Sequence, residues 1–341
     1  MATTWTRADL RDRLVRYSDL IPCRSAFIDT RTPGSQEKEN FTIIGPGVAE
    51  NPEQHVHIAL PHGFNIGGAR QPPGCVNSQH SHETAEVFVV KSGTWKFTLG
   101  ESGDDGHVIL EPGDTISIPT QVFRGFTNVG TDEGFLFAVL GGDDPGHVTW
   151  APYVFDMAKD YGLVLLSDGR LVDTTRGETV PPDAHVMPPT TAETVAQLQR
   201  MTSSDLESCV IRFGQSADEE QTLWPGFFEA PLIGAACPRD GQPEAHIAWP
   251  HGFQLRRQRL QYLAASQWFF RAEPEVVMVF SGQLTLETPT HEFTLKAGDV
   301  MTVPIDMPRR YRNDETEDAI SYIVRGGDQP TGFQPAEPAA A

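Results

Sequence analysis

Apolar residues along this chain fall in short runs rather than in long helical stripes. Four clear runs are "EVFVV" (86–90), "WKFTL" (95–99), "TISIP" (115–119) and "FLFAVL" (135–140). Gly, Pro and Asp separate such runs roughly every eight to twelve residues, which is the spacing of strands in a sandwich or barrel. The pattern therefore predicts an all-β fold with a few peripheral helices.

One helix is expected before the first strands, in "TRADLRDRLVRYSDLI" (6–21). Leu10, Leu14 and Tyr17 fall near one face of such a helix, and Thr6 can cap its first turn. This segment therefore predicts a helical extension ahead of the β-rich part.

The stretch from about 150 to 225 also departs from the strand pattern. We expect a short helix at 153–162 that ends at Gly162, and another at 191–201. Between them, "LVLLSDGRLVD" (163–173) predicts a hairpin with Asp-Gly at its tip. The stretch is therefore interpreted as a connector.

An internal repeat organises the chain. "HIALPHGF" (57–64) returns as "HIAWPHGF" (246–253), and "PGDTISIP" (112–119) as "AGDVMTVP" (297–304). The chain is thus interpreted as a tandem duplication of one unit. The expected parts are an N-terminal helical extension (1–40), an N-terminal barrel (41–150), a connector (151–225), a C-terminal barrel (226–333) and a disordered tail (334–341).

The composition and charge of the chain limit the kinds of molecule that it is expected to bind. The 341 residues carry a formal net charge of −20, with 46 acidic and 26 basic residues, which argues against nucleic acid and anionic membranes. The sequence contains neither a long apolar span nor an apolar signal-peptide core. The four cysteines are scattered, so we expect reduced thiols in a cytoplasmic protein; they are Cys23, Cys75, Cys209 and Cys237.

The candidate chemistry lies in "QHSHETAEVFVVKSG" (79–93). His80 and His82 are two apart, so on a strand they point to the same face. Glu86 is four residues further, roughly 13 Å along a straight strand, which is too far for one shared metal ion. We therefore expect a turn after His82 and a second strand beside the first, which brings Glu86 to the histidines. Polar residues at a strand end are the alternative.

The spacing of these residues resembles that of the cupin superfamily, and their tandem repetition resembles the bicupins. The first cupin motif is filled throughout, by Gly74, His80, His82, Glu86 and Gly93 at its spacing. The resemblance implies a jelly-roll β-barrel in each repeat, with a metal inside.

The second cupin motif is filled only in part. Gly113, Pro119 and Asn128 fit it, whereas Gln121 replaces a glycine and Arg124 replaces the fourth ligand, a histidine. A guanidinium cannot coordinate a metal, but it can bind an anionic substrate. Arg124 is therefore a candidate substrate-binding residue. Pairing with a barrel carboxylate or backbone is the alternative, because Arg309 repeats it.

The second copy has lost the histidines of the first. Phe269 and Arg271 stand where His80 and His82 stand, and only Glu275 is kept. Phenylalanine cannot coordinate a metal, and Arg271 can neutralise Glu275. The C-terminal barrel is therefore expected to hold no metal.

Two further histidines recur in both copies. His57 and His62 return as His246 and His251, one pair of them in the barrel that should hold no metal. We therefore expect them to form hydrogen bonds with the backbone.

Two histidines and one carboxylate with open positions are typical of non-haem Fe(II) oxygenases. The resemblance and this donor set favour a cupin dioxygenase, an oxidoreductase acting on a small organic acid or phenolic compound. Mn, Ni, Co or Zn would suit a lyase, isomerase or decarboxylase in the same barrel. A ligand-binding bicupin without activity is the third alternative. Chains are expected to form homodimers or higher homo-oligomers.

Overall fold

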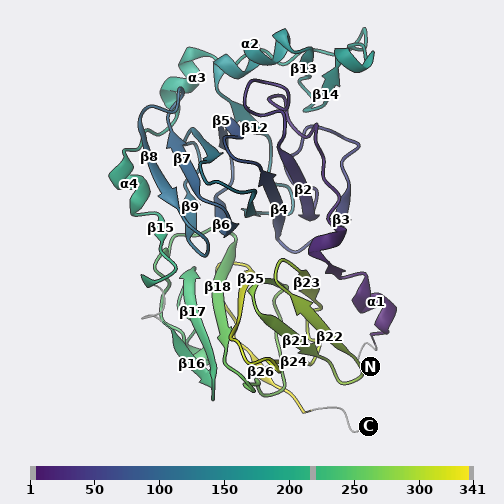
Figure 1. Ribbon diagram of the computed structural model, residues 1–341, viewed down its shortest axis with the longest axis vertical. Helices are drawn as coiled ribbons and strands as arrows, with labels where there is room; N and C mark the ends of the chain where they lie inside the picture. Colours follow the sequence, from purple (N-terminus) through teal and green to yellow (C-terminus); the bar gives the residue numbers. More distant parts are fainter. Residues whose placement is uncertain (1–4, 216–219, 338–341) are drawn as a thin grey trace. The chain divides into compact units, whose positions relative to one another are not determined.

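The computed structural model describes residues 5–215 and 220–337. Two compact units divide the chain, and each contains one copy of the repeat (Figure 1). The unit called here the N-terminal barrel consists of Ile21–Ala59 and Asn65–Val210. The C-terminal barrel consists of Met1–Leu20, Leu60–Phe64 and Ile211–Ala341. The stretch expected as one extension, 1–40, thus contributes to both units.

The N-terminal barrel is built from two sheets, as expected for a jelly roll. Among the described residues, one sheet has seven strands: β15 (Val210–Ile211), β9 (Thr115–Ile118), β6 (Glu86–Ser92), β11 (Gly134–Gly141), β4 (Phe64–Gln71), β2 (Glu39–Ile44) and β3 (Val56–Ile58). The other has five: β12 (Val148–Trp150), β5 (Val76–His82), β10 (Arg124–Asn128), β7 (Trp95–Leu99) and β8 (Gly106–Leu110). All four apolar runs singled out in the sequence lie in these strands, which confirms the all-β prediction.

Alternation along β6 sorts its side chains between the two faces of the sheet. Phe88 and Val90 pack in the apolar core with Trp95, Phe97 and other aromatic and aliphatic residues. The Phe88 and Phe97 rings lie 5.1 Å apart, an aromatic pair within the core. Because residues two apart share a face, this packing turns Glu86 toward the interior, as the sequence predicts.

The connector contains the predicted helices and hairpin. Helix α2 (Pro152–Asp160) is followed by Gly162 at φ 73°, a left-handed conformation that favours glycine. Strands β13 (Leu163–Leu165) and β14 (Leu171–Asp173) form the hairpin. The 3₁₀ helix η2 (Thr174–Arg176), α3 (Ala192–Gln197) and α4 (Ser203–Glu207) follow, and α4 lies against β8 (Figure 1).

The N-terminal helix is shorter than expected. Thr6 caps α1 (Arg7–Arg11) in a capping box, but the helix ends there. Leu14 and Val15 then form β1, which pairs with β23, and Tyr17–Asp19 form a 3₁₀ turn, η1. Pairing with a strand edge therefore overrides the helical periodicity of 6–21.

The C-terminal barrel repeats the arrangement. Its larger sheet contains β1 (Leu14–Val15), β23 (Val300–Val303), β20 (Glu275–Ser281), β25 (Ala319–Gly326), β18 (Phe253–Leu260), β17 (Phe227–Ile233) and β16 (Gln221–Trp224). Smaller sheets contain β22 (Glu292–Lys296), β21 (Gln283–Glu287) and β24 (Arg310–Arg312), and β19 (Phe269–Phe270) with β26 (Gln334–Pro335). A 3₁₀ turn, η4 (Pro238–Asp240), precedes β18.

The tail differs from the sequence expectation at its start. Gln334 and Pro335 form β26 against Phe270 and Phe269, so this part of the expected disordered tail is ordered by strand pairing. Residues 338–341 lie outside the described residues.

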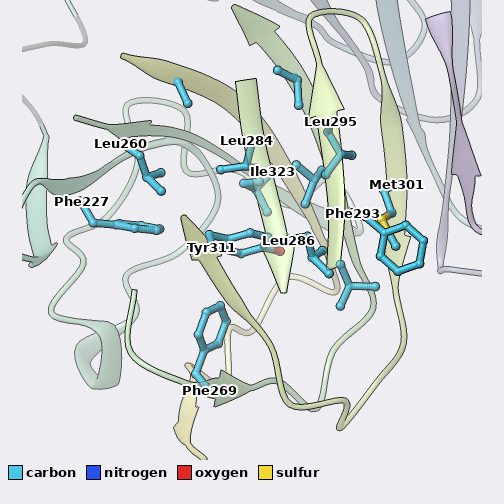
Figure 2. Packing of buried hydrophobic residues seen from close by; sticks show 14 of the residues in the cluster. Phe227, Leu260, Phe269, Leu284, Leu286, Phe293, Leu295, Met301, Tyr311 and Ile323 are labelled. Carbon is cyan, nitrogen blue, oxygen red and sulfur yellow. The ribbon is translucent and has the colours of Figure 1, made fainter. Parts of the chain in front are cut away.

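An apolar side chain takes the position of the lost histidine in the C-terminal barrel. Figure 2 shows Phe269 and Tyr311 among the aliphatic side chains of this core. The two rings lie 5.8 Å apart, and both residues are buried. Phe269 thus fills space in the core where the first copy carries His80.

None of the helices in the described ranges combines the length and the apolar character needed to cross a bilayer.

Candidate metal centre

The metal-ligand candidates lie where the chain passes from one sheet of the N-terminal barrel to the other. His80 and His82 belong to β5, and Glu86 opens β6 after a three-residue turn. The turn is as expected, but β6 does not pair with β5. The two strands lie in different sheets, so the carboxylate reaches the imidazoles across the barrel interior.

The three side chains converge. Ligand atoms of His80, His82 and Glu86 all lie within 4.8 Å of one another, and all three residues are buried. His82 Nε2 lies 3.6 Å from Glu86 Oε2, and the two imidazole rings are 5.0 Å apart. Atoms about 2.0–2.2 Å from one ion can lie up to about 4.4 Å apart, so small movements suffice to place all three on one metal. The donor set could therefore hold a metal ion.

Hydrogen bonding fixes the proton of His80. Its Nδ1 lies 2.7 Å from the Ser78 carbonyl, which can only accept, so Nδ1 carries the hydrogen. In the neutral ring this leaves a lone pair on Nε2. His82 Nδ1, by contrast, is buried with no hydrogen-bond partner among the described residues.

Burial keeps both imidazoles neutral. It holds the pKa of His80 and of His82 well below the usual range, and the nearby Arg124 charge lowers both further. A metal ion therefore competes with no proton at these two ligands near neutral pH. Burial also raises the pKa of Glu86, and the charge and hydrogen bonds of Arg124 offset part of that rise.

Arg124, the candidate substrate-binding residue, is fully buried and contacts Glu86. Its Nη2 and Nε donate to Glu86 Oε2 at 2.7 and 3.2 Å. Its Nη1 donates to the carbonyls of His80 and Val122. These contacts match the pairing alternative, and direct contact with a substrate stays a prediction.

A cavity of about 80 Å³ opens beside the three donors. At roughly 10–15 Å³ per water, it has room for about five to eight waters or a ligand of similar size. The walls combine apolar and amide side chains, including Phe27, Asn40, Thr42, Phe88, Phe126, Leu140 and Trp150. Asn40 Nδ2 is a buried donor with no hydrogen-bond partner in the described parts of the chain. The site is therefore a small pocket with few polar contacts.

Small residues create this cavity, as the second copy shows. Leu140 lies opposite Glu86 on neighbouring strands, and Arg325 lies opposite Glu275 in the same way. The repeat also places Gly67 where the C-terminal barrel carries Arg256. Two long side chains of the second copy are therefore absent from the first.

Three arginines surround the carboxylate of the second site. Arg309 Nη2 lies 2.7 Å from Glu275, Arg325 Nε 2.9 Å and Arg271 Nε 3.3 Å. Burial acts to raise the pKa of Glu275, but the three guanidinium charges hold it well below its usual range. The neutralisation by Arg271 is confirmed, and two further arginines, Arg309 and Arg325, contribute to it.

His57, His62 and His251 form hydrogen bonds with the backbone, as expected. His57 Nδ1 donates to the Thr42 carbonyl, and its Nε2 accepts from Ile21 N at 3.0 Å. His62 and His251 donate from Nδ1 to the carbonyls of Leu60 and Trp249. None of these three belongs to the ligand group found in the described residues.

Trp150 is a site residue that the sequence patterns did not reveal. It pairs with His80 across β12 and β5, and its ring lies 5.3 Å from the imidazole. Its Nε1 donates to Glu50 Oε1 at 2.6 Å. Burial raises the pKa of Glu50 to about 8, against hydrogen bonds from Trp150 and Ile28 that lower it. These contacts join segments that are distant in sequence. In the sequence, Trp150 is a single tryptophan outside any motif, so no pattern marked it as a site residue.

Comparisons with known proteins agree with this architecture. The family model described as "Cupin domain" matches residues 69–140 and 261–324, one match in each copy. "Germin-like protein subfamily 1 member 7" of Arabidopsis thaliana is 35% identical over 88 residues. That match spans 24% of this chain and 38% of the germin-like protein, well under two thirds of that relative's length.

Solved structures share the fold across nearly the whole chain. An oxalate decarboxylase variant from Bacillus subtilis matches with a TM-score of 0.54 at 13% identity, covering 95% of this chain and 79% of that chain. The Lactobacillus farciminis oxalate decarboxylase formate complex matches with a TM-score of 0.57 at 11% identity, covering 98% and 90%. The chain therefore contains two cupin domains in tandem, one on each jelly-roll unit, and shares its fold with these oxalate decarboxylases.

Proposed function

We propose that the N-terminal barrel is the site of a metal-dependent enzyme that oxidises a small carboxylic acid with O₂, using Fe(II). The supporting observation is the convergence of His80, His82 and Glu86 beside a cavity, with Arg124 bonded to Glu86. Two imidazoles and one carboxylate with open positions suit Fe(II), substrate and O₂ together. Mn, Ni, Co and Zn fit the same donors.

The chain's own residues would bind and orient the reactants. His80 and His82 offer neutral nitrogen lone pairs, and Glu86 offers one carboxylate while Arg124 holds its Oε2. The bound metal would supply Lewis acidity and, as Fe(II), electrons for O₂. One carboxylate, one guanidinium and a divalent ion leave positive charge in a buried site, which favours an anionic substrate.

Decarboxylation or another lyase or isomerase reaction of a small acid is the second candidate. One observation favours it, since the solved structures that share the fold include oxalate decarboxylases. The cavity of about 80 Å³ suits a small acid better than a phenolic ring, which agrees with both candidates. In this alternative Arg124 would serve the same purpose, as a fixed positive charge beside Glu86.

Oxygen dependence separates the two candidates. Anaerobically purified, Fe(II)-loaded protein would be tested on a panel of small carboxylates and phenols with an oxygen electrode and a CO₂ assay. We expect turnover of a carboxylate with O₂ consumption. Equal CO₂ release without O₂ would support the decarboxylase, and tight binding without turnover would support a ligand-binding protein. Sedimentation velocity on the same sample tests the predicted homodimer.

A further inference from the structure

A fully buried ion pair lies close to His80. Lys38 Nζ contacts the Asp29 carboxylate directly, and neither side chain is exposed. Removing two charges from water costs several kcal/mol per ion, so a buried ion pair is often no more stable than a well-packed apolar pair. Stability alone therefore does not account for this pair.

Both members of the pair bind β5 at consecutive residues. Asp29 Oδ2 accepts from Ser78 N at 3.0 Å, and Lys38 Nζ donates to Asn77 Oδ1 at 3.1 Å. The ion pair therefore anchors the two residues that come shortly before His80 in the strand.

These two residues also contact the imidazole. The Ser78 carbonyl accepts the Nδ1 hydrogen of His80, and Asn77 Nδ2 lies 3.4 Å from the same ring nitrogen. Lys38 holds the amide oxygen of Asn77, which fixes the orientation of that amide. The Asn77 NH2 group can only donate, so the Ser78 carbonyl is the group that favours the hydrogen on Nδ1, and Asp29 and Lys38 anchor the strand segment that carries this carbonyl.

The second copy provides an internal control. Strand pairing places Glu39 opposite Arg70 and Phe228 opposite Arg259, so Phe227 stands where Lys38 stands. The repeat likewise places Phe269 at the position of His80. The buried lysine is therefore present in the copy that has an imidazole to orient, and absent from the copy that does not.

We propose that Lys38 and Asp29 are positioning residues for the metal centre. They anchor Asn77 and Ser78 on β5 and so keep the Ser78 carbonyl in place to accept the Nδ1 hydrogen of His80, which leaves the lone pair on Nε2. This inference rests on the proposed metal site. Groups that orient a ligating histidine in this way affect metal affinity without touching the ion.

The test replaces the ion pair by apolar residues, in Lys38→Met/Asp29→Leu. Such a replacement leaves no unpaired buried charge, so the variant should melt close to the wild type. We expect its Co(II) affinity, measured by titration against a chelator, to fall roughly tenfold or more. In the metal-free protein, ¹⁵N NMR of the His80 ring should show one tautomer in the wild type and a mixture in the variant.

Arg70→Met is the matched control. Arg70 forms an ion pair with Glu39, the residue next to Lys38, and Glu39 has a second cation partner in Arg24. It should leave both the Co(II) affinity and the His80 tautomer unchanged. Asn77→Ser, which introduces the serine found at this position in the second copy, provides a second variant if the double variant does not fold.

An unchanged tautomer and unchanged Co(II) affinity would overturn the inference. Wild-type protein that binds no Co(II), Mn(II) or Fe(II) would instead refute the metal site. In that case the tautomer of the metal-free protein still decides whether the ion pair positions His80.

Discussion

Leu140 lies opposite Glu86 on neighbouring strands, in the position where Arg325 lies opposite Glu275 in the second copy. The leucine leaves Glu86 with one guanidinium partner, Arg124, and leaves space beside it. The arginine instead binds Glu275. This exchange is one of the differences that distinguish the open site from the closed one.

Leu140→Arg should therefore close the N-terminal site. The new guanidinium would bind Glu86 and exclude a cation, so metal content should fall from about one ion per chain to nearly none. Elemental analysis after dialysis measures this.

Asn40→Glu added to Leu140→Arg should restore stability without restoring metal. The repeat places Glu229 at the position of Asn40, and Glu229 binds Arg325 through both carboxylate oxygens at 2.8 Å. The double variant should therefore melt at a higher temperature than the single one. Retention of a full metal equivalent in the double variant would show that the site is elsewhere.

His82→Ala should empty the metal site, since two remaining ligands hold a divalent ion poorly. His57→Ala is the control from the same barrel, because both ring nitrogens of His57 hydrogen-bond backbone groups. It should lower the melting temperature and leave metal content intact. Equal metal loss in both variants would point to a general effect of destabilisation.

Arg124→Met should destabilise the metal-free protein by about 3–5 kcal/mol, because it leaves Glu86 buried without its cation. Added metal would supply the missing positive charge, so the rise in melting temperature on metal addition should exceed that of the wild type. If Arg124 also binds substrate, KM should increase as well. Arg309→Met is the comparison, and it should show no response to metal, since Arg271 and Arg325 still neutralise Glu275.

Stability should decline with rising pH because of Glu50. Burial raises its pKa from 4.5 to about 8 in the folded state, so the folded protein keeps a proton that the unfolded chain releases. Its contribution is complete below about pH 4.5 and is lost as the pH rises through about 8, by at most about 5 kcal/mol. Glu50→Gln keeps an acceptor for Trp150 but does not ionise. Urea unfolding at several pH values should therefore show a flatter pH dependence for the variant, and identical slopes would contradict this assignment.

Sequence alone predicted the features that depend on spacing and repetition. Short apolar runs separated by turn residues predicted the strands, and the duplicated "HIALPHGF" segment predicted two copies. The motif spacing identified His80, His82 and Glu86 as candidate metal ligands. In the second copy, Phe269 and Arg271 replace the two histidines, which showed that its histidine ligands were lost. Such features are local, so residue order is enough to reveal them.

Tertiary structure decided the features that depend on contacts between distant segments. It placed β5 and β6 in different sheets, and it paired Leu14 and Val15 with β23 rather than extending α1. It paired Arg124 with Glu86, and it placed Lys38 and Asp29 in hydrogen-bonding contact with β5. These contacts arise when the barrel closes, because packing of the interior, rather than the preference of any one segment, determines which buried charges become neighbours.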